Sequence, residues 1–315
     1  MNIGLPYKTK QFFFVLIKLS LVFGAFYAIY KKLSKNNELD FEAFIQFLNE
    51  NDAFLIKNLG FLLILSSFNW FFEILKWQKL VSVVQNISFS KALEQSLGSF
   101  AVSIFTPNRL GEYGAKAIYF EKSLRAQILY LNLMGNLTQM ISTMIFGSIG
   151  LIAFAKYGNF TVNHSNLTLV SILLGLCFIL MFILFKKRIV FKKHTAELPN
   201  RALISSLMYS ILRYLIFSFQ FYVILYLFGI RISYFDAMTF ITLMYLMSSF
   251  VPSILIFDVV IKGSIAVYLF SYLGISSLAI LSTVSLMWFL NFAVPSLIGS
   301  YYILVFKLNP IQQQA

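Results

Sequence analysis

The 315-residue sequence has very few of the residues on which metal sites and soluble enzymes depend. It contains one cysteine, Cys177, and two histidines, His164 and His194. A single cysteine cannot form an intramolecular disulfide, and these three residues do not supply the ligand spacing of zinc, haem or iron–sulfur sites. No motif for a catalytic nucleophile is present either. The sequence therefore predicts no metal, no cofactor and no catalytic residue, and we expect a protein that is not an enzyme.

Charged residues are scarce as well. Asp, Glu, Lys and Arg make up 12% of the sequence, about half the share that is usual in a soluble domain. Apolar residues make up 59%, including 36 Phe and 17 Tyr, and several apolar runs reach the roughly 20 residues that cross a bilayer core. This composition predicts an all-α, polytopic integral membrane protein in which residues 1–315 form a single transmembrane domain.

Among the charged residues, acidic side chains are the minority. The chain has 12 Asp and Glu against 25 Lys and Arg, which gives a net charge of +13. In a membrane protein this excess is typical of cytoplasmic loops and of contact with anionic lipid, so no nucleic-acid partner is predicted. The most basic loop, at 186–201, is assigned to the cytoplasm. Counting spans from it places both termini in the cytoplasm of a multi-pass protein of the cell membrane.

The apolar runs predict six spans, at about 12–30, 55–80, 126–155, 167–185, 202–228 and 276–306. Pro295 interrupts the last of them, which can be one tilted, kinked helix or two shorter pieces. Two further apolar segments, 93–122 and 238–273, are interrupted by proline and by charged residues. Neither arm of the first segment is long enough to cross a bilayer at 1.5 Å per residue. We therefore expect two re-entrant or broken helical hairpins beside six spans, or eight spans if the arms of the hairpins also cross.

The interruption of the first segment contains most of its unusual residues: Pro107, Arg109, Gly111, Glu112 and Lys116. Irregular backbone at membrane depth needs cover from protein or from a water-filled cavity, and ionisable side chains there are candidate functional residues. Arg109 can bind a phosphate group through two hydrogen bonds, and Lys116 can add a second positive charge. Glu112 can hold Arg109 in place or pair with an amino group. These residues predict a binding site for a polar headgroup.

Polar residues on two of the spans each have two interpretations. One face of the span at 126–155 carries three amides, Asn132, Asn136 and Gln139. They can line a path through the protein or join helices by hydrogen bonds, and both interpretations are kept. On the span at 55–80, Glu73 is interpreted as part of an interfacial belt anchored by Trp70 and Trp77. The alternative is that Glu73 faces a cavity.

Arg213, near the middle of the span at 202–228, is a further candidate binding residue, with Gln220 two turns beyond it. An arginine at that depth costs several kcal/mol unless it is paired or hydrated. We therefore expect a carboxylate partner for it, and the candidates are Glu73, Glu112 and Asp258.

The two interrupted segments are similar to each other in sequence. ISFSKA at 87–92 matches ISYFDA at 232–237 with an offset of 145 residues. The same offset, with one inserted residue after the prolines, pairs Pro107 with Pro252, Glu112 with Asp258, and Lys116 with Lys262. Polar residues in the same order and at nearly the same spacing indicate an internal repeat, with halves at about 55–155 and 202–306. The predicted orientation of the loops makes it an inverted repeat, which is typical of alternating-access transporters.

The stretch TPNRLGEYGAKA at 106–117 resembles the Pro-x-Arg-hydrophobic-Gly-Glu signature of the lysylphosphatidylglycerol synthase/flippase transmembrane-domain family. The resemblance covers nearly the whole chain, which would correspond to the membrane domain without the soluble aminoacyl-transferase domain. It implies movement of lipids between leaflets, with Pro107, Arg109, Gly111 and Glu112 as the marked residues. The second half departs from the family pattern, because PSILIFD at 252–258 replaces a glycine-rich turn.

The leading hypothesis is a flippase-like transporter that moves a polar-headed phospholipid or a lipid-linked precursor between leaflets. Its expected partners are membrane lipids with anionic or aminoacylated headgroups, and its candidate substrate-binding residues include Asp258 and Lys262 beside those of the first segment. One alternative is an ion-coupled transporter of small solutes in which Glu112 and Asp258 alternate as proton or cation sites. Another is a membrane scaffold that does not transport, or that assists a separate synthase.

Overall fold

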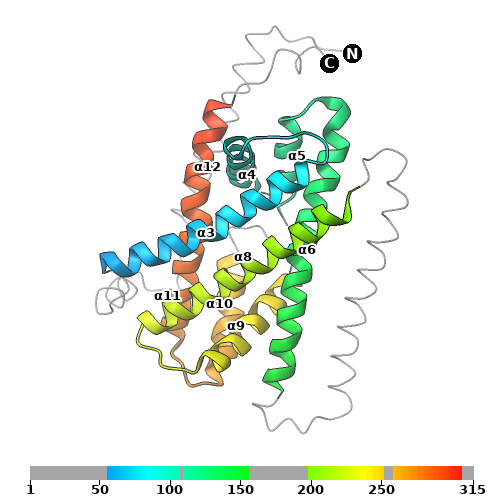
Figure 1. The fold of residues 1–315 in the computed structure, drawn as a ribbon. Coiled ribbons are helices and arrows are strands. Elements are labelled where there is room, and N and C mark those ends of the chain that lie inside the picture. The colour runs from blue at the N-terminus through cyan, green and yellow to red at the C-terminus, as the bar shows by residue number, and fades with distance from the viewer. Residues whose placement is uncertain (1–54, 105, 107–108, 156–197, 252–257, 307–315) are drawn as a thin grey trace, which may run out of the picture.

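The computed structural model describes residues 55–104, 106, 109–155, 198–251 and 258–306 (Figure 1). Helix is the regular structure found in these ranges. The predicted spans at 12–30 and 167–185 lie outside the described residues, as do Pro107 and most of the basic loop at 186–201.

The described helices are α3 (Ile56–Val81), α4 (Phe89–Ser103), α5 (Leu110–Ile118), α6 (Lys122–Phe154), α8 (Asn200–Leu227), α9 (Tyr234–Ser249), α10 (Asp258–Ser271), α11 (Ser277–Trp288), the π-helical turn η4 (Phe289–Ala293) and α12 (Val294–Val305). Four are long and apolar enough to cross a membrane: α3, α6, α8 and the continuous run Ser277–Val305. The prediction of an all-helical membrane protein is confirmed for the described ranges. The count of six to eight spans and the re-entrant geometry stay predictions.

Both interrupted segments consist of two short helices. α4 ends at Ser103 and α5 begins at Leu110, while α9 ends at Ser249 and α10 begins at Asp258. The first helix of each segment begins at a serine cap: Ser88 Oγ accepts from the N–H of Lys91, and Ser233 Oγ accepts from the N–H of Asp236. A capping serine satisfies one of the free N–H groups at a helix start, so equivalent residues fix the start of both helices.

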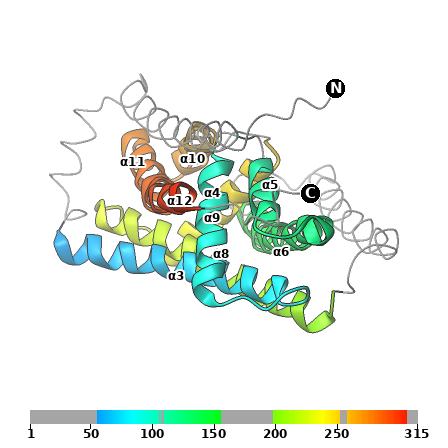
Figure 2. The ribbon, with the colours of Figure 1, turned by 90° about the horizontal axis from the view of Figure 1, so that it is seen from above.

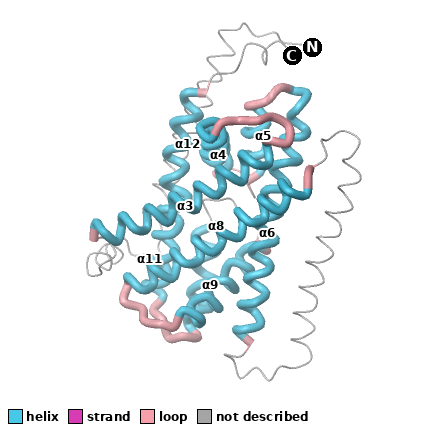
Figure 3. The backbone as a smooth tube through the Cα atoms, in the orientation of Figure 1, coloured by secondary structure: helices cyan, strands magenta, loops and turns pink. Residues whose placement is uncertain are grey.

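α3 and α8 lie side by side and run in opposite directions (Figures 1 and 2). The register follows from three contacts: Phe72 with Tyr209, Asn69 with Arg213, and Ser66 with Gln220. The residue numbers on α8 rise as those on α3 fall, which is the register of an antiparallel pair. As a result, the loop from α3 to α4 and the loop from α8 to α9 lie at opposite ends of the molecule (Figure 3).

α6 packs against α9, and α12 packs against α4. Each pair joins a helix from the first half of the chain to one from the second half. Glycine allows both crossings to be close, as is common between membrane helices. A Cβ atom at Gly150 would lie 2.1 Å from Thr242 Oγ1, and one at Gly299 would lie 2.1 Å from the carbonyl oxygen of Leu97. Since real Cβ atoms do not approach other atoms so closely, a side chain at either position forces the helices apart.

We expect Gly299→Ala to lower the stability of the protein by about 1–3 kcal/mol, because the added methyl group overpacks the α12–α4 crossing. The measurement is thermal unfolding in detergent. The matched control is Gly60→Ala on α3, where nothing lies within 4 Å of the added Cβ and where alanine favours helix by up to about 1 kcal/mol. Equal melting temperatures for the two variants would contradict the close crossing.

The last apolar stretch forms one continuous helical run, which settles the open choice between one kinked helix and two pieces. The π-helical turn at 289–293 interrupts its α-helical geometry immediately before Pro295. Proline has no N–H to donate to the carbonyl of Asn291, four residues earlier. That carbonyl instead accepts a hydrogen bond of 3.1 Å from Trp70 Nε1. Turns of this kind occur often at functional sites, and Asn291 is part of the site described below.

Candidate functional site

A cavity of about 250 Å³ lies where α3, α6, α8, the π-helical turn and the two interrupted segments meet. Four charged side chains line it: Arg109, Arg213, Asp258 and Lys262. Three amides join them, Asn69, Gln139 and Asn291, and most of the remaining wall is aromatic, from Trp70, Phe100, Tyr214, Phe217, Tyr245 and Phe292. The cavity thus brings together charged residues from both interrupted segments with the arginine of α8.

Arg109 reaches this cavity through an unusual backbone conformation. Its φ angle is 60°. Among the residues that the structure describes, it is the only one other than glycine with a positive φ. The turn before α5 is fixed by Thr106, whose Oγ1 accepts a hydrogen bond of 2.8 Å from the N–H of Gly111. The guanidinium of Arg109 lies 2.6 Å from Glu112 Oε2 and 5.2 Å from the ring centroid of Phe100. Because a left-handed conformation is costly for a residue with a side chain, the contacts around Arg109 must hold it in place.

Glu112 and Lys116 lie behind Arg109 and do not line the cavity. Lys116 Nζ lies 2.7 Å from Glu112 Oε1, donates to Asn132 Oδ1 at 2.9 Å and lies 4.2 Å from the ring centroid of Trp77. Both side chains of the ion pair are only 2% exposed. The carboxylate is therefore shared between a buried lysine and the arginine that faces the cavity, so Glu112 positions Arg109.

The second interrupted segment carries the same pair in a more open setting. Lys262 Nζ lies 2.7 Å from Asp258 Oδ2, and these side chains are 20% and 17% exposed. Three aromatic rings, those of Phe217, Tyr245 and Phe292, have their centroids 5.3–5.9 Å from the ammonium group. Contacts of this kind attract a cation to the face of a ring, so the aromatic wall holds Lys262 beside the cavity.

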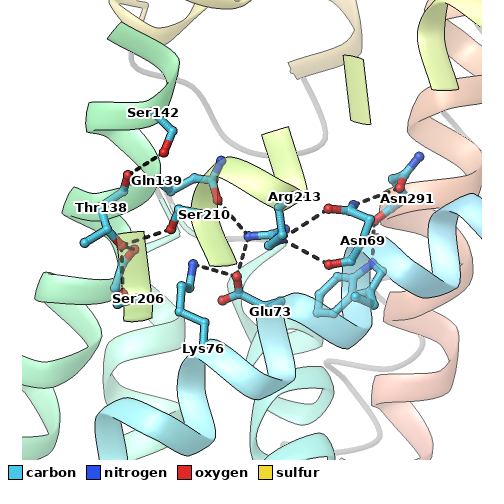
Figure 4. Close-up of polar contacts among 12 residues, drawn as sticks. Asn69, Glu73, Lys76, Thr138, Gln139, Ser142, Ser206, Ser210, Arg213 and Asn291 are labelled. Carbon is cyan, nitrogen blue, oxygen red and sulfur yellow. Dashed lines mark hydrogen bonds and ion pairs between the residues drawn. The ribbon is translucent and has the colours of Figure 1, made fainter. Parts of the chain in front are cut away.

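Arg213 connects α8 to two other helices (Figure 4). It forms an ion pair with Glu73 on α3, which in turn lies 2.7 Å from Lys76 Nζ. Its Nε donates to the carbonyl oxygen of Asn69 at 3.2 Å and to Asn69 Oδ1 at 3.1 Å, and its Nη1 donates to Gln139 Oε1 at 3.2 Å. Of the three carboxylates predicted as partners for Arg213, the structure selects Glu73.

The sequence matches the protein family described as lysylphosphatidylglycerol synthase TM region over residues 15–299. The chain belongs to this family. The match covers both interrupted segments and every residue that lines the cavity. Searches of curated proteins and of solved structures found no match.

In this member of the lysylphosphatidylglycerol synthase TM family, a row of amides continues from Arg213 into the bundle. Asn69 Nδ2 donates to Asn291 Oδ1 at 3.0 Å, and Asn291 Nδ2 donates to Gln220 Oε1 at 2.9 Å. Gln220 Nε2 then donates to the carbonyl oxygen of Leu62 and to Ser66 Oγ. Gln220 is fully buried and joins α8 to α3. Gln220 was predicted to bind substrate, but it does not line the cavity and joins helices instead.

The predicted polar face of α6 divides between its two interpretations. Gln139 lines the cavity and contacts Arg213, whereas Asn132 accepts from Lys116 and Asn136 donates to Tyr113 OH at 3.0 Å. One amide therefore faces the cavity and two join helices. Nothing in the sequence distinguishes them, because the three share one helix face and only the packing of α5 decides which are covered.

The interpretation of Trp70 and Trp77 as interfacial anchors is wrong. Their side chains are buried, at 8% and 1% exposure, and each indole N–H has a partner inside the bundle. Trp77 donates to Gln95 Oε1 at 2.8 Å. Glu73 is buried at 4% exposure. It does not line the cavity, so the alternative of a carboxylate that faces a cavity does not describe it either. Glu73 instead pairs with Arg213 and Lys76 in the interior.

Sequence reasoning missed Asn69 and Asn291 as lining residues. Asn69 lies one helical turn before Glu73, and Asn291 lies four residues before Pro295. A buried amide one turn from an intramembrane carboxylate, and a polar residue whose carbonyl loses its helical donor to proline, were the signals that could have identified them.

Proposed function

We propose that this protein binds the anionic headgroup of a lipid in the central cavity and moves the lipid between the two leaflets. The cavity lining contains three cations, Arg109, Arg213 and Lys262, and one carboxylate, Asp258. Arg109 and Arg213 present guanidinium groups, which suit phosphate because they donate two parallel hydrogen bonds. The observation that carries the proposal is that this cationic cavity shares a wall with an apolar one. No covalent step is part of it.

The second cavity, of about 180 Å³, lies between α6, α8 and α9. Its lining is mostly apolar, and it shares Tyr214 with the central cavity. Tyr214 stacks on Phe146 with 4.8 Å between the ring centroids, so a single layer of aromatic side chains separates the two spaces. A cationic space beside an apolar one fits a ligand with a charged head and a hydrocarbon tail, which favours a lipid over a small polar solute.

An inverted repeat would supply the means of movement. The caps of α4 and α9 are 145 residues apart, the offset found in the sequence. α6 packs on α9 as α12 packs on α4, and α3 runs antiparallel to α8. These relations support halves of opposite orientation that rock around a fixed site. We propose accordingly six spans and two hairpins in the cell membrane, with both termini in the cytoplasm.

A scaffold that does not transport is the second candidate, because every cation at the site also has a carboxylate partner. Lys76 and Arg213 contact Glu73, Arg109 and Lys116 contact Glu112, and Lys262 contacts Asp258. Buried ion pairs of this kind can serve the specificity of a fold. In a scaffold, substitutions at the cavity change stability and leave lipid movement at the background rate.

Lys262→Met is expected to slow the movement of anionic lipids by roughly ten- to a hundredfold, since a hydrogen bond to a charged group contributes about 1.5–3 kcal/mol. The measurement uses liposomes that contain tail-labelled phosphatidylglycerol and an external quencher. The matched control is Lys79→Met, at an exposed position of α3 outside the cavity, which is expected to move lipid at the wild-type rate.

The outcomes separate the candidates. Equal rates for wild type and Lys262→Met, both at background, together with intact folding, would favour the scaffold. Lipid movement at background, together with solute uptake into sealed liposomes that follows a proton or sodium gradient, would favour the transport of a small solute.

A further inference from the structure

The buried charges around the central cavity do not balance. Five cations belong to the connected ion pairs: Lys76, Arg109, Lys116, Arg213 and Lys262. Only three carboxylates accompany them, Glu73, Glu112 and Asp258. In the described part of the chain this cluster therefore carries two positive charges in excess. The neighbouring residues of the two breaks, at 105, 107–108 and 252–257, contain no Asp, Glu, Lys or Arg, so they cannot change the count.

The excess is presented at the cavity. The four inner side chains, Glu73, Lys76, Glu112 and Lys116, are 2–5% exposed and pair among themselves. The cations that face the cavity are more open, with side-chain exposures of 28% for Arg109, 14% for Arg213 and 20% for Lys262. Charges at membrane depth are costly unless they are paired or hydrated. A ligand that brings two negative charges would neutralise the cluster.

We propose that the headgroup which this cavity takes is a phosphate monoester, a dianion, on a lipid. This inference rests on the proposed function, in which the cavity binds a lipid headgroup. A phosphate monoester carries about −1.5 to −2 at pH 7, whereas a phosphodiester carries one negative charge. An aminoacylated headgroup adds positive charge to a site that already has too much of it.

The size of the cavity agrees with a small headgroup. Its volume of about 250 Å³ is below the roughly 300–1,000 Å³ of sites that enclose a drug-sized ligand. A bare phosphate needs no room for an esterified alcohol or amino acid beyond it. Arg109 can donate a pair of hydrogen bonds to the three free oxygens of a monoester. Arg213 can add hydrogen bonds from Nη2, because its contacts with Asn69, Glu73 and Gln139 use Nε and Nη1. A diester offers fewer of these oxygens.

The first test compares three tail-labelled lipids in phosphatidylcholine liposomes at pH 7.5. These are phosphatidic acid as the monoester, phosphatidylglycerol as the diester and an aminoacylated phosphatidylglycerol. The initial rate for phosphatidic acid is expected to exceed that for phosphatidylglycerol by about tenfold and that for the aminoacylated lipid by more. Equal or faster movement of phosphatidylglycerol overturns this inference and leaves the proposed function standing. Background rates for all three overturn both.

The second test changes the charge of the site by one unit. Gln139 lines the cavity and contacts Arg213, so Gln139→Glu introduces a carboxylate of nearly the same shape. It reduces the excess to one positive charge and is expected to lower the rate ratio of phosphatidic acid to phosphatidylglycerol by about tenfold. Gln139→Met is the neutral control and is expected to keep the ratio. Both rates are measured with the same preparation of protein, so a loss of folded protein lowers them equally and does not change their ratio. An unchanged ratio in Gln139→Glu contradicts the charge argument.

Discussion

An Arg109→Gly protein is expected to lose nearly all transport of anionic lipid while it stays folded. The side chain that it removes faces the cavity from the break between α4 and α5. Its removal leaves no buried carboxylate alone, because Glu112 keeps its ion pair with Lys116 at 2.7 Å. The loss is expected to be at least a hundredfold, because two charged hydrogen bonds to phosphate disappear together, at about 1.5–3 kcal/mol each.

The backbone at this position separates activity from stability. With φ at 60°, any residue that carries a Cβ atom is strained by roughly 1–2 kcal/mol, and glycine is not. Arg109→Ala removes the same guanidinium but keeps the strain. We therefore expect Arg109→Gly and Arg109→Ala to lose transport equally. The free energy of unfolding of the glycine variant is expected to be about 1 kcal/mol higher than that of the alanine variant.

The measurement pairs the liposome assay with thermal unfolding in detergent for both variants and for Arg109→Lys. The lysine variant keeps the positive charge but cannot form the two parallel hydrogen bonds of a guanidinium, so an intermediate rate is expected. Transport at the wild-type rate by Arg109→Gly would exclude the arginine from headgroup binding. A glycine variant less stable than the alanine variant would show that the left-handed conformation is not under strain.

The parts of this site that depend on local geometry could be predicted from the sequence. Glu112 and Lys116, like Asp258 and Lys262, are four residues apart, and side chains at that spacing meet on a helix. Both pairs are present, at 2.7 Å each. The bounds of α3 and α8 could also be predicted, because the length of an apolar run sets them. Both helices begin and end within two residues of the predicted spans. Apolar length and local breaks are properties of consecutive residues.

The parts that depend on packing could not be predicted. Arg213 had three candidate carboxylates, and only the antiparallel register of α3 and α8 places Glu73 against it. Similarly, the preference of tryptophan for membrane interfaces is an average, and it does not reveal that Asn291 and Gln95 would offer acceptors for the indoles of Trp70 and Trp77 inside the bundle. The cavity itself arises where α3, α6, α8, the π-helical turn and the two interrupted segments meet, and no single segment encodes it.

The largest expected effect on stability is that of Glu73→Gln. Glu73 is 5% exposed at its side chain and neutralises two cations at once, Lys76 and Arg213. Breaking a buried ion pair by removing one partner costs about 3–5 kcal/mol, because the other charge remains buried and uncompensated. Here two cations would remain, so we expect Glu73→Gln to fall at or above the upper end of that range in thermal unfolding. Glu121→Gln, at an exposed position, is the control and should change little.

A second substitution is expected to rescue this loss. Lys76→Met alone keeps the pair between Glu73 and Arg213, so its cost should be much smaller than that of Glu73→Gln. The double variant removes one carboxylate and one ammonium, leaves a single cation that still has Asn69 and Gln139 as acceptors, and should recover about 2 kcal/mol or more. Additive losses in the double variant would show that the two side chains do not interact. In Lys76→Met, Arg213 keeps its ion pair with Glu73 and therefore its position at the cavity. If this variant transports lipid at the wild-type rate, Glu73 contributes to transport by holding Arg213 at the cavity.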